Sequence, residues 1–461
     1  MKRKSTIRYA LILLVATMLG GCSGLLHRSE YNRPDVSMPQ QWQATGVTGS
    51  SVATAAQWWR DFNDPVLSEL IERALKTNNN LAAATIKVKR AQLSSRLTGT
   101  NLTPSLSATA SSRRSRDLTN HVDTDSSGAA LSASYELDLW GKLAGARDAS
   151  SWETEATEFD RQSTALSLVG TVATNYWTIA YLNDRIASVE ASIANAEKIL
   201  GLVEVKYAAG AVSGQDKIQA QQTIVSQKAQ LTQLQQQRNE ARNALAILFD
   251  QSPENTLPEL QRLPSGSLPQ VDAGLPASIL AQRPDLQAAE FRLKKYLANV
   301  DNTRASYYPS FTLTGSLGTS STSLTDVLKN PYTILGAGLS LPFIEWNTME
   351  LNVEIAKTDY EEAVVNFRQT LYSALSDVEN ALSARSHFAE EVKQREESLA
   401  LSVKAEELAK IRYRSGATAL QSWLDAQESR RDAERALAVA RLSELQNNMA
   451  LYQALGGAMQ M

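Results

Sequence analysis

Cysteine and histidine are scarce in this sequence. Its 461 residues include one cysteine, Cys22, and three histidines that stand far apart. This scarcity excludes a disulfide framework and a metal site built from clustered cysteines or histidines. The sequence also lacks a nucleophile elbow and a phosphate-binding loop. We therefore expect a protein that is not an enzyme and that binds no metal or dissociable cofactor.

Charge of one sign is not in excess either. The chain has 46 Lys and Arg residues against 49 Asp and Glu residues, for a formal net charge of −3. Proteins that bind nucleic acid usually present a basic surface, so no nucleic-acid partner is expected.

The amino-terminus lacks an apolar run long enough to span a bilayer as a permanent helix, since Ala10–Leu19 is too short. The run follows a basic head and precedes Gly20, Gly21 and Cys22, which resembles the lipobox of bacterial lipoproteins. We expect Cys22 to carry a covalent lipid; the alternative is an ordinary signal peptide with an incidental cysteine. Ser23, in place of Asp, points to the outer membrane. One lipid anchor binds only modestly, so further membrane contacts are expected.

Proline is missing from two long stretches with a helical period, 142–207 and 347–413. At about 1.5 Å per residue, each predicts a rod of roughly 100 Å. Each stretch ends near a glycine, Gly210 or Gly416, and glycine lets a helix end in a left-handed turn. In the first stretch, apolar residues recur in alternating steps of three and four, which is typical of a coiled-coil seam. The sequence thus predicts two long helical hairpins, over about 142–249 and 347–455.

Two other stretches alternate between apolar and polar residues, at about 104–139 and 309–343. Each predicts a pair of strands, and strands of about ten residues cross a bilayer when tilted. The polar stretches 113–127 and 320–331 are expected to form the loops within these pairs. Half of a soluble sheet would show the same alternation.

The chain is duplicated. Tyr207 and Tyr413 mark the two hairpin tips and are 206 residues apart, and the other paired features keep almost the same offset. A chance pattern does not hold its register over such a distance. The predicted segments are a signal peptide at 1–21, a lipidated extended segment at 22–65, a first repeat at 66–250, a proline-rich linker at 251–276 and a second repeat at 277–461.

Four strands cannot close a membrane barrel, whose smallest usual form has about eight strands. Open sheet edges are not tolerated in lipid, so several copies of the chain must share one barrel. The long helices have a dry face and a wet face, which suggests a second, helical barrel in the periplasm. Stacked end to end, the two barrels would make a conduit.

Five short motifs resemble those of the TolC-type outer-membrane efflux factors, in the lipoprotein branch of NodT-, OprM- and CusC-like proteins. They are Tyr31–Pro34, Trp59–Pro65, Arg283–Leu286, Tyr308–Ser310 and Arg412–Gly416. The resemblance covers essentially the whole mature chain. It implies a homotrimer with a twelve-stranded outer-membrane barrel, a twelve-helix periplasmic barrel and a small equatorial mixed region. It also implies a periplasmic adaptor and an inner-membrane pump as partners, and the role of exit duct in a tripartite efflux system.

The sequence departs from the family pattern at one strand-to-helix junction. The first junction, Asp138–Lys142, carries the expected acidic residue, glycine and basic residue. The second junction, 343–347, lacks the glycine. The resemblance therefore does not define the turn at the second junction.

In the family, the hairpin tips converge to close the periplasmic end at an acidic ring. The resemblance assigns this ring to Asp425, twelve residues after Tyr413. Close carboxylates repel each other and attract cations, so such a ring would filter by charge; the alternative is a solvated helix carboxylate. Gln421 and Ser422 are expected to line the constriction, and Asp216 is a weaker gate candidate. The tip residues expected to contact the adaptor are Tyr207, Gly210, Tyr413, Arg414, Ser415 and Gly416.

Two other classes of protein share some of these features. A structural coiled-coil outer-membrane lipoprotein would have the long helices and the lipobox, but not four alternating strands at duplicated positions. A passive porin would not need the long hairpins. The seven methionines form no cluster that would indicate copper or silver as the cargo. The sequence therefore does not indicate the exported substrate.

Overall fold

The computed structural model describes residues 28–43, 57–253, 257–266, 268–269, 271, 273–274 and 276–457. The predictions for the signal peptide and for the lipid on Cys22 lie outside these residues. Among the helices of the described ranges, none has the length and hydropathy needed to cross a membrane.

The chain forms two compact units, and each unit combines parts of both repeats. Of the described residues, unit 1 contains those within 28–36, 86–159 and 287–369, and unit 2 contains those within 37–85, 160–286 and 370–457. The two repeats therefore do not fold as separate domains that follow one another along the chain.

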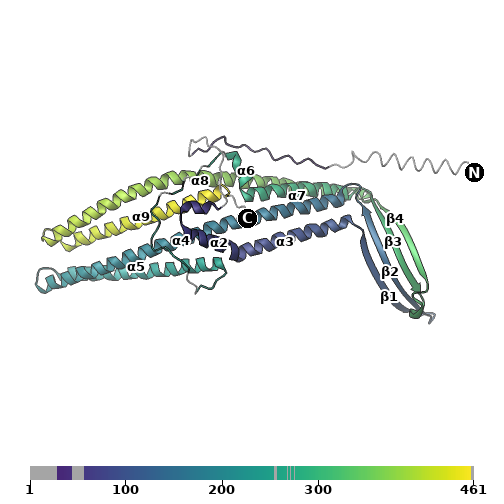
Figure 1. The fold of residues 1–461 in the computed structure, drawn as a ribbon, viewed down its shortest axis with the longest axis horizontal. Coiled ribbons are helices and arrows are strands. Elements are labelled where there is room, and N and C mark those ends of the chain that lie inside the picture. Colours follow the sequence, from purple (N-terminus) through teal and green to yellow (C-terminus); the bar gives the residue numbers. More distant parts are fainter. Residues whose placement is uncertain are drawn as a thin grey trace, which may run out of the picture. The chain divides into compact units, whose positions relative to one another are not determined.

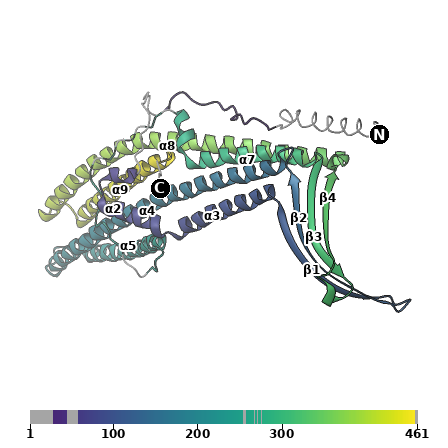
Figure 2. The ribbon, with the colours of Figure 1, turned by 45° about the vertical axis from the view of Figure 1, so that its right-hand side comes forward.

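Unit 1 contains a four-stranded antiparallel sheet in the order β1-β2-β3-β4 (Figure 2). Its strands are β1 (Ser105–Arg116), β2 (Asp123–Leu137), β3 (Ser310–Ser321) and β4 (Pro331–Ser340). The strands are paired over long registers, from Ser105 opposite Ser134 to Arg116 opposite Asp123 in the first hairpin. The two alternating stretches therefore form one continuous sheet, with the second hairpin added beside the first.

The loop expected at 113–127 is wrong in extent, because most of these residues belong to strands. Charged side chains pair across the ladder there, with the Arg114 guanidinium 3.0 Å from the Asp123 carboxylate. Opposite charges on facing positions stabilise a strand pair, so a polar stretch can continue the ladder without apolar residues. The loop expected at 320–331 is likewise shorter, since β3 continues to Ser321 and β4 begins at Pro331.

The two strand-to-helix junctions use different turns. At the first, Gly141 has φ +72°, and the Asp138 carboxylate accepts hydrogen bonds from the backbone N–H groups of Leu143 (2.9 Å) and Ala144 (2.8 Å). At the second, a 3₁₀ turn, Pro342–Ile344, leads into the next helix with no left-handed residue. The missing glycine is thus replaced by a turn that does not need one.

The amino-terminal segment is held on unit 1 by polar contacts with α7 (Pro284–Ser306). Ser29 donates hydrogen bonds from its backbone N–H and its hydroxyl to Asp301, both at 2.7 Å. Arg33 donates two hydrogen bonds to the buried Glu290 carboxylate, at 3.2 and 2.7 Å. The hydrogen bond to Glu290 raises the pKa of the Arg33 guanidinium. The Tyr31–Pro34 motif therefore secures this segment to the folded unit.

Long helices make up most of the chain (Figure 1). The helices not yet bounded are α2 (Pro65–Thr77), α3 (Asn79–Gly99), α4 (Lys142–Ala208), α5 (Gly214–Ala246), α6 (Ile279–Gln282), α8 (Trp346–Arg414) and α9 (Leu420–Ala454). The Asp64 carboxylate caps α2 by accepting the Leu67 N–H at 2.9 Å, and Pro65 is the first helical residue, as predicted.

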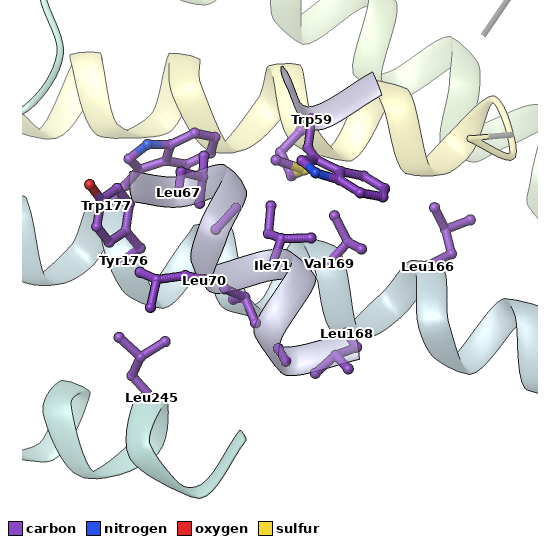
Figure 3. Close-up of a cluster of buried hydrophobic side chains, with 14 of the residues drawn as sticks. Trp59, Leu67, Leu70, Ile71, Leu166, Leu168, Val169, Tyr176, Trp177 and Leu245 are labelled. Atoms are coloured by element: carbon purple, nitrogen blue, oxygen red, sulfur yellow. The ribbon is translucent and has the colours of Figure 1, made fainter. Parts of the chain in front are cut away.

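The core of unit 2 forms where α2 and a preceding turn, Trp58–Phe62, pack on α4, α5 and α9 (Figure 3). The Trp58 indole is fully buried and stacks on Tyr452 with ring centroids 4.7 Å apart. The Tyr452 hydroxyl donates to the Asp61 carboxylate at 2.9 Å. Trp58 and the adjoining Trp59–Pro65 motif therefore form part of the core in which the hairpin helices pack together.

The proline-rich segment expected as a linker packs against this core. Leu257, Leu260 and Val271 contact the cluster of buried side chains. Glu259 accepts two hydrogen bonds from the Arg242 guanidinium, at 2.6 and 2.7 Å. The described residues of this segment are thus part of the folded unit 2.

Candidate channel gate at the hairpin tips

The two helical hairpins end in the same backbone turn. Gly210 and Gly416 have φ +70° and +76°, the left-handed conformation that glycine adopts without strain. Their N–H groups bond to the carbonyls of Tyr207 (2.9 Å) and Tyr413 (3.1 Å), and the following N–H groups bond to the carbonyls five residues back. This is the Schellman arrangement that ends a helix at glycine.

The two tips pack on each other through a small apolar cluster. Ile199 and Val203 of α4 contact Tyr413, Trp423 and other buried side chains from the second hairpin. The Tyr413 and Trp423 ring centroids are 5.5 Å apart. Lys206 Nζ lies 4.2 Å from the centre of the Tyr413 ring, a cation–π contact. The second tip is therefore held against the first by its aromatic side chains.

This packing gives the two duplicated tyrosines, Tyr207 and Tyr413, different exposures. The Tyr413 side chain is 4% exposed, whereas the Tyr207 side chain is 49% exposed. Burial raises the pKa of the Tyr413 hydroxyl, and the nearby Asp216 carboxylate adds to the shift. The expectation that the Tyr413 ring contacts an adaptor is at odds with this position, because the ring fills the cluster between the tips. The surface of the tips is formed by exposed residues that include Tyr207, Gly210, Arg414, Ser415 and Gly416.

Asp425 lies on the exposed side of α9. Gln421, Ser422 and Asp425 are exposed, whereas Trp423 and Leu424, in the same turns, are buried. The Gln421 side-chain amide donates to the Asp425 carboxylate at 2.5 Å. The helical period therefore places the predicted constriction residues together, on the face opposite the aromatic packing.

Asp216 has a local structural role. Its carboxylate accepts hydrogen bonds from the Ser213 backbone N–H (2.9 Å) and hydroxyl (2.7 Å), and the Ser213 hydroxyl accepts the Asp216 N–H. This capping box begins α5. In the second repeat the corresponding residues are Ala419 and Ser422, so α9 has no such cap. The capping box explains why an acidic residue is present at position 216 without assigning it a role in gating.

A polar network just behind Asp425 was not identified from the sequence. The Gln427 amide donates to Glu406 of α8 at 3.2 Å, and Arg430 Nε lies 2.5 Å from the other Glu406 carboxylate oxygen. Arg430 also pairs with Glu434, which accepts a hydrogen bond from Ser188 of α4 at 3.3 Å. The network links α4, α8 and α9 near the tips. Polar residues at seam positions of a coiled coil, where apolar residues are usual, are the sequence signal that could have indicated this network.

The described residues contain no group of three or more His, Cys, Asp or Glu side chains placed to hold a metal ion.

A family model for outer membrane efflux proteins matches residues 70–249 and 275–457, which includes most of both repeats. The chain belongs to this family. It is 31% identical over 458 residues to the toxin and drug export protein A of Aggregatibacter actinomycetemcomitans, covering 98% of each chain. It is 33% identical over 438 residues to the pyoverdine export outer membrane protein OpmQ of Pseudomonas aeruginosa, covering 92% of each chain.

The fold is also that of solved efflux channels. The open state of the Neisseria gonorrhoeae MtrE outer membrane channel matches with a TM-score of 0.84 and 30% identity, covering 94% of this chain and 98% of that one. This member of the family is thus an outer-membrane efflux channel, an exit duct with a large periplasmic part. Transport is the activity of the family.

Proposed function

We propose that three copies of this chain share one barrel and form the exit duct of a tripartite efflux system. The observation that carries the proposal is the open sheet of unit 1. Strands β1 and β4 each pair with one neighbour within the chain, and every residue of both strands is exposed. An edge strand in lipid must find a partner, so β4 of one copy pairs with β1 of the next.

Exposed apolar stripes on the hairpin helices support the same assembly. Ile218 and Val225 lie seven residues apart on α5 and are 65% and 67% exposed. Leu401 and Leu408 repeat the spacing on α8 and are 58% and 63% exposed. A seven-residue repeat of apolar side chains is the pattern of helices that pack side by side. These stripes are covered by helices of the neighbouring copies.

The gate of this duct is a ring of three Asp425 carboxylates, with Gln421 and Ser422 lining the same constriction. The exposed side of α9 supports this assignment, because the three side chains point away from the aromatic packing that holds the tips. Repulsion within the ring stores energy in the closed state. Asp216 belongs to the capping box and not to the ring.

The exposed tip residues are the contact surface for a periplasmic adaptor, which connects the duct to an inner-membrane pump. Tyr207 and Arg414 supply the large side chains there, and Gly210, Ser415 and Gly416 let a partner approach the backbone. Tyr413 contributes from behind, by fixing the second tip on the first. A lipid on Cys22 adds an anchor to the outer membrane.

Native mass spectrometry of the detergent-solubilised mature protein tests the assembly. We expect a species of three times the chain mass that persists on dilution. A monomer would contradict the shared barrel, because the edges of β1 and β4 would then have no partners.

A further inference from the structure

The two faces of the sheet differ in chemistry. Leu106 of β1, Leu131 of β2, Leu317 of β3 and Leu335 of β4 share one face, since the strand registers align them, and they are 53% to 84% exposed. Apolar side chains on a membrane sheet face lipid. The other face therefore lines the lumen. It consists mainly of Ser, Thr and Gly residues, which are Ser105, Ser107, Thr109, Ser111, Thr124, Ser126, Gly128, Ser132, Ser134, Ser310, Thr312, Thr314, Ser316, Gly318, Ser320, Gly336, Gly338 and Ser340.

Two charged residues interrupt this hydroxyl-lined face within the four strands. Glu136 lies near the helical end of β2, and the Lys142 ammonium group neutralises it at 2.7 Å. Arg113 lies near the opposite end, beside Ser126 across the ladder. Among the described residues, Arg113 has no hydrogen-bond or ion-pair partner. It is the uncompensated charge of the luminal face.

The next residue along the strand provides a contrast. Arg114 is on the lipid-side face and lies 3.0 Å from the Asp123 carboxylate and 3.7 Å from that of Asp125. Its charge is balanced on the outside of the sheet. Adjacent residues of a strand point to opposite faces, so Arg113 points into the lumen.

We propose that Arg113 from each copy forms a cationic ring at the outer mouth of the duct and that this ring makes the exit prefer anions. The proposal rests on the three-copy barrel of the proposed function. The ring lies beyond the apolar band of the sheet, because Arg113 follows Ala110, the last apolar residue of β1, by three positions. Anionic cargo meets a favourable field there as it leaves.

The size of the barrel makes the field effective. A closed sheet of twelve strands about 4.8 Å apart, tilted by about 40°, has a backbone diameter of about 24 Å. An arginine side chain reaches roughly 6 Å from its backbone, so three guanidinium groups would lie about 10 Å apart. The Debye length is about 10 Å at 0.1 M salt, so an ion at the centre of the ring experiences all three charges.

Reversal potentials in planar bilayers under a potassium chloride gradient test the ring. We expect Arg113→Gln to lower the chloride-to-potassium permeability ratio by about threefold at 0.1 M salt, with a smaller change at 1 M salt. Arg113→Glu inverts the preference, and Arg113→Lys keeps it because the charge is retained. The variants are measured with native Asp425 and with Asp425→Ala, since a closed periplasmic end would otherwise dominate the selectivity.

The matched control is Arg114→Gln, which removes a neighbouring charge from the other face and leaves the permeability ratio unchanged. An unchanged ratio in conducting trimers of both Arg113→Gln and Arg113→Glu would overturn the ring and leave the duct intact. Equal effects of Arg114→Gln and Arg113→Gln would also overturn it. Absence of trimers and of conductance in the unmodified protein would contradict the proposed function instead.

Discussion

At the scale of single residues, two carboxylates at corresponding ends of the hairpins have different roles. Asp216 accepts hydrogen bonds that begin α5, whereas the Asp425 carboxylate points outward with one amide partner, Gln421. The hydrogen bonds from Ser213 fix the Asp216 carboxylate at the start of α5. In the proposed assembly it is therefore Asp425 that faces its counterparts in the other copies.

We expect Asp425→Ala to make the closed channel leakier, because the smaller side chain widens the proposed constriction and this effect outweighs the relief of repulsion among the three carboxylates. Single-channel conductance in planar bilayers measures the change, and Asp425→Asn separates the loss of charge from the loss of size. Unchanged conductance in an intact trimer would contradict the gate assignment.

Asp216→Ala is the matched comparison. It removes the capping box of α5 and should cost about 1 kcal/mol of stability without raising the conductance. Thermal unfolding and the same bilayer recording measure the two effects. If Asp216→Ala opened the channel as far as Asp425→Ala, the capping role would not be its main one.

Arg283 joins three segments of unit 2, through Asp285, Asp377 and Ala454. Its guanidinium lies 2.7 Å from the Asp285 carboxylate and 3.2 Å from the Asp377 carboxylate, and donates to the Ala454 carbonyl at 3.1 Å. Arg283→Ala leaves these acceptors without their donor, so we expect a loss of about 2–3 kcal/mol in the free energy of unfolding. Arg283→Lys should recover part of it. A loss below about 0.5 kcal/mol for Arg283→Ala would show that water replaces the guanidinium.

At the scale of elements, the helix ends depend on glycine at two turns. Gly416 has φ +76° and no neighbouring atom within 4 Å of an added Cβ, so Gly416→Ala costs backbone strain alone. We expect about 1 kcal/mol of destabilisation and faster amide exchange at 411–419. Gly201→Ala is the control, because Gly201 is helical and also has open space. A stabilised Gly416→Ala hairpin would contradict the strained-turn argument.

The stability contributed by Glu259, in the proline-rich segment of unit 2, should depend on pH. Burial opposes ionisation of Glu259, but hydrogen bonds from Arg242 and Asn183 outweigh it and hold the pKa of Glu259 below its usual value. A lowered pKa in the folded state contributes stability above the unfolded value of about 4.3, and the contribution is lost as the pH falls through the folded value. Glu259→Gln should therefore cost about 1–2 kcal/mol at pH 7, and the cost should shrink as the pH falls below the unfolded value. A cost that did not change as the pH fell would exclude the ion pair as its source.

At the scale of the whole molecule, Cys22 is expected to attach the duct to the membrane through lipid. Cys22→Ser should abolish incorporation of labelled palmitate. Trimers should still form, because in the proposed assembly the strand edges join the copies and the lipid does not. Palmitate incorporation that persisted in Cys22→Ser would contradict lipidation at this residue.

The duplication, the four strands and the long hairpins could be predicted because each is a periodic signal within one segment. Alternation by two and steps of three and four are local properties of the chain, as is the glycine that ends each helix. The extents of the strands were underestimated, since the pairing of Arg114 with Asp123 across the turn depends on the register. Asp425 was assigned from the family resemblance, and the helical period explains why it shares the exposed side of α9 with Gln421 and Ser422.

The sequence by itself determined which elements form, that they are repeated, and which family the motifs resemble, because these depend on neighbours along the chain. Only the tertiary structure decided that Tyr413 is buried while Tyr207 is exposed. It also showed that Asp216 caps a helix and that Glu406, Gln427 and Arg430 form a network across helices. Two copies of the same motif differ in role because each packs against a different surface, and such contacts are not encoded in either copy alone.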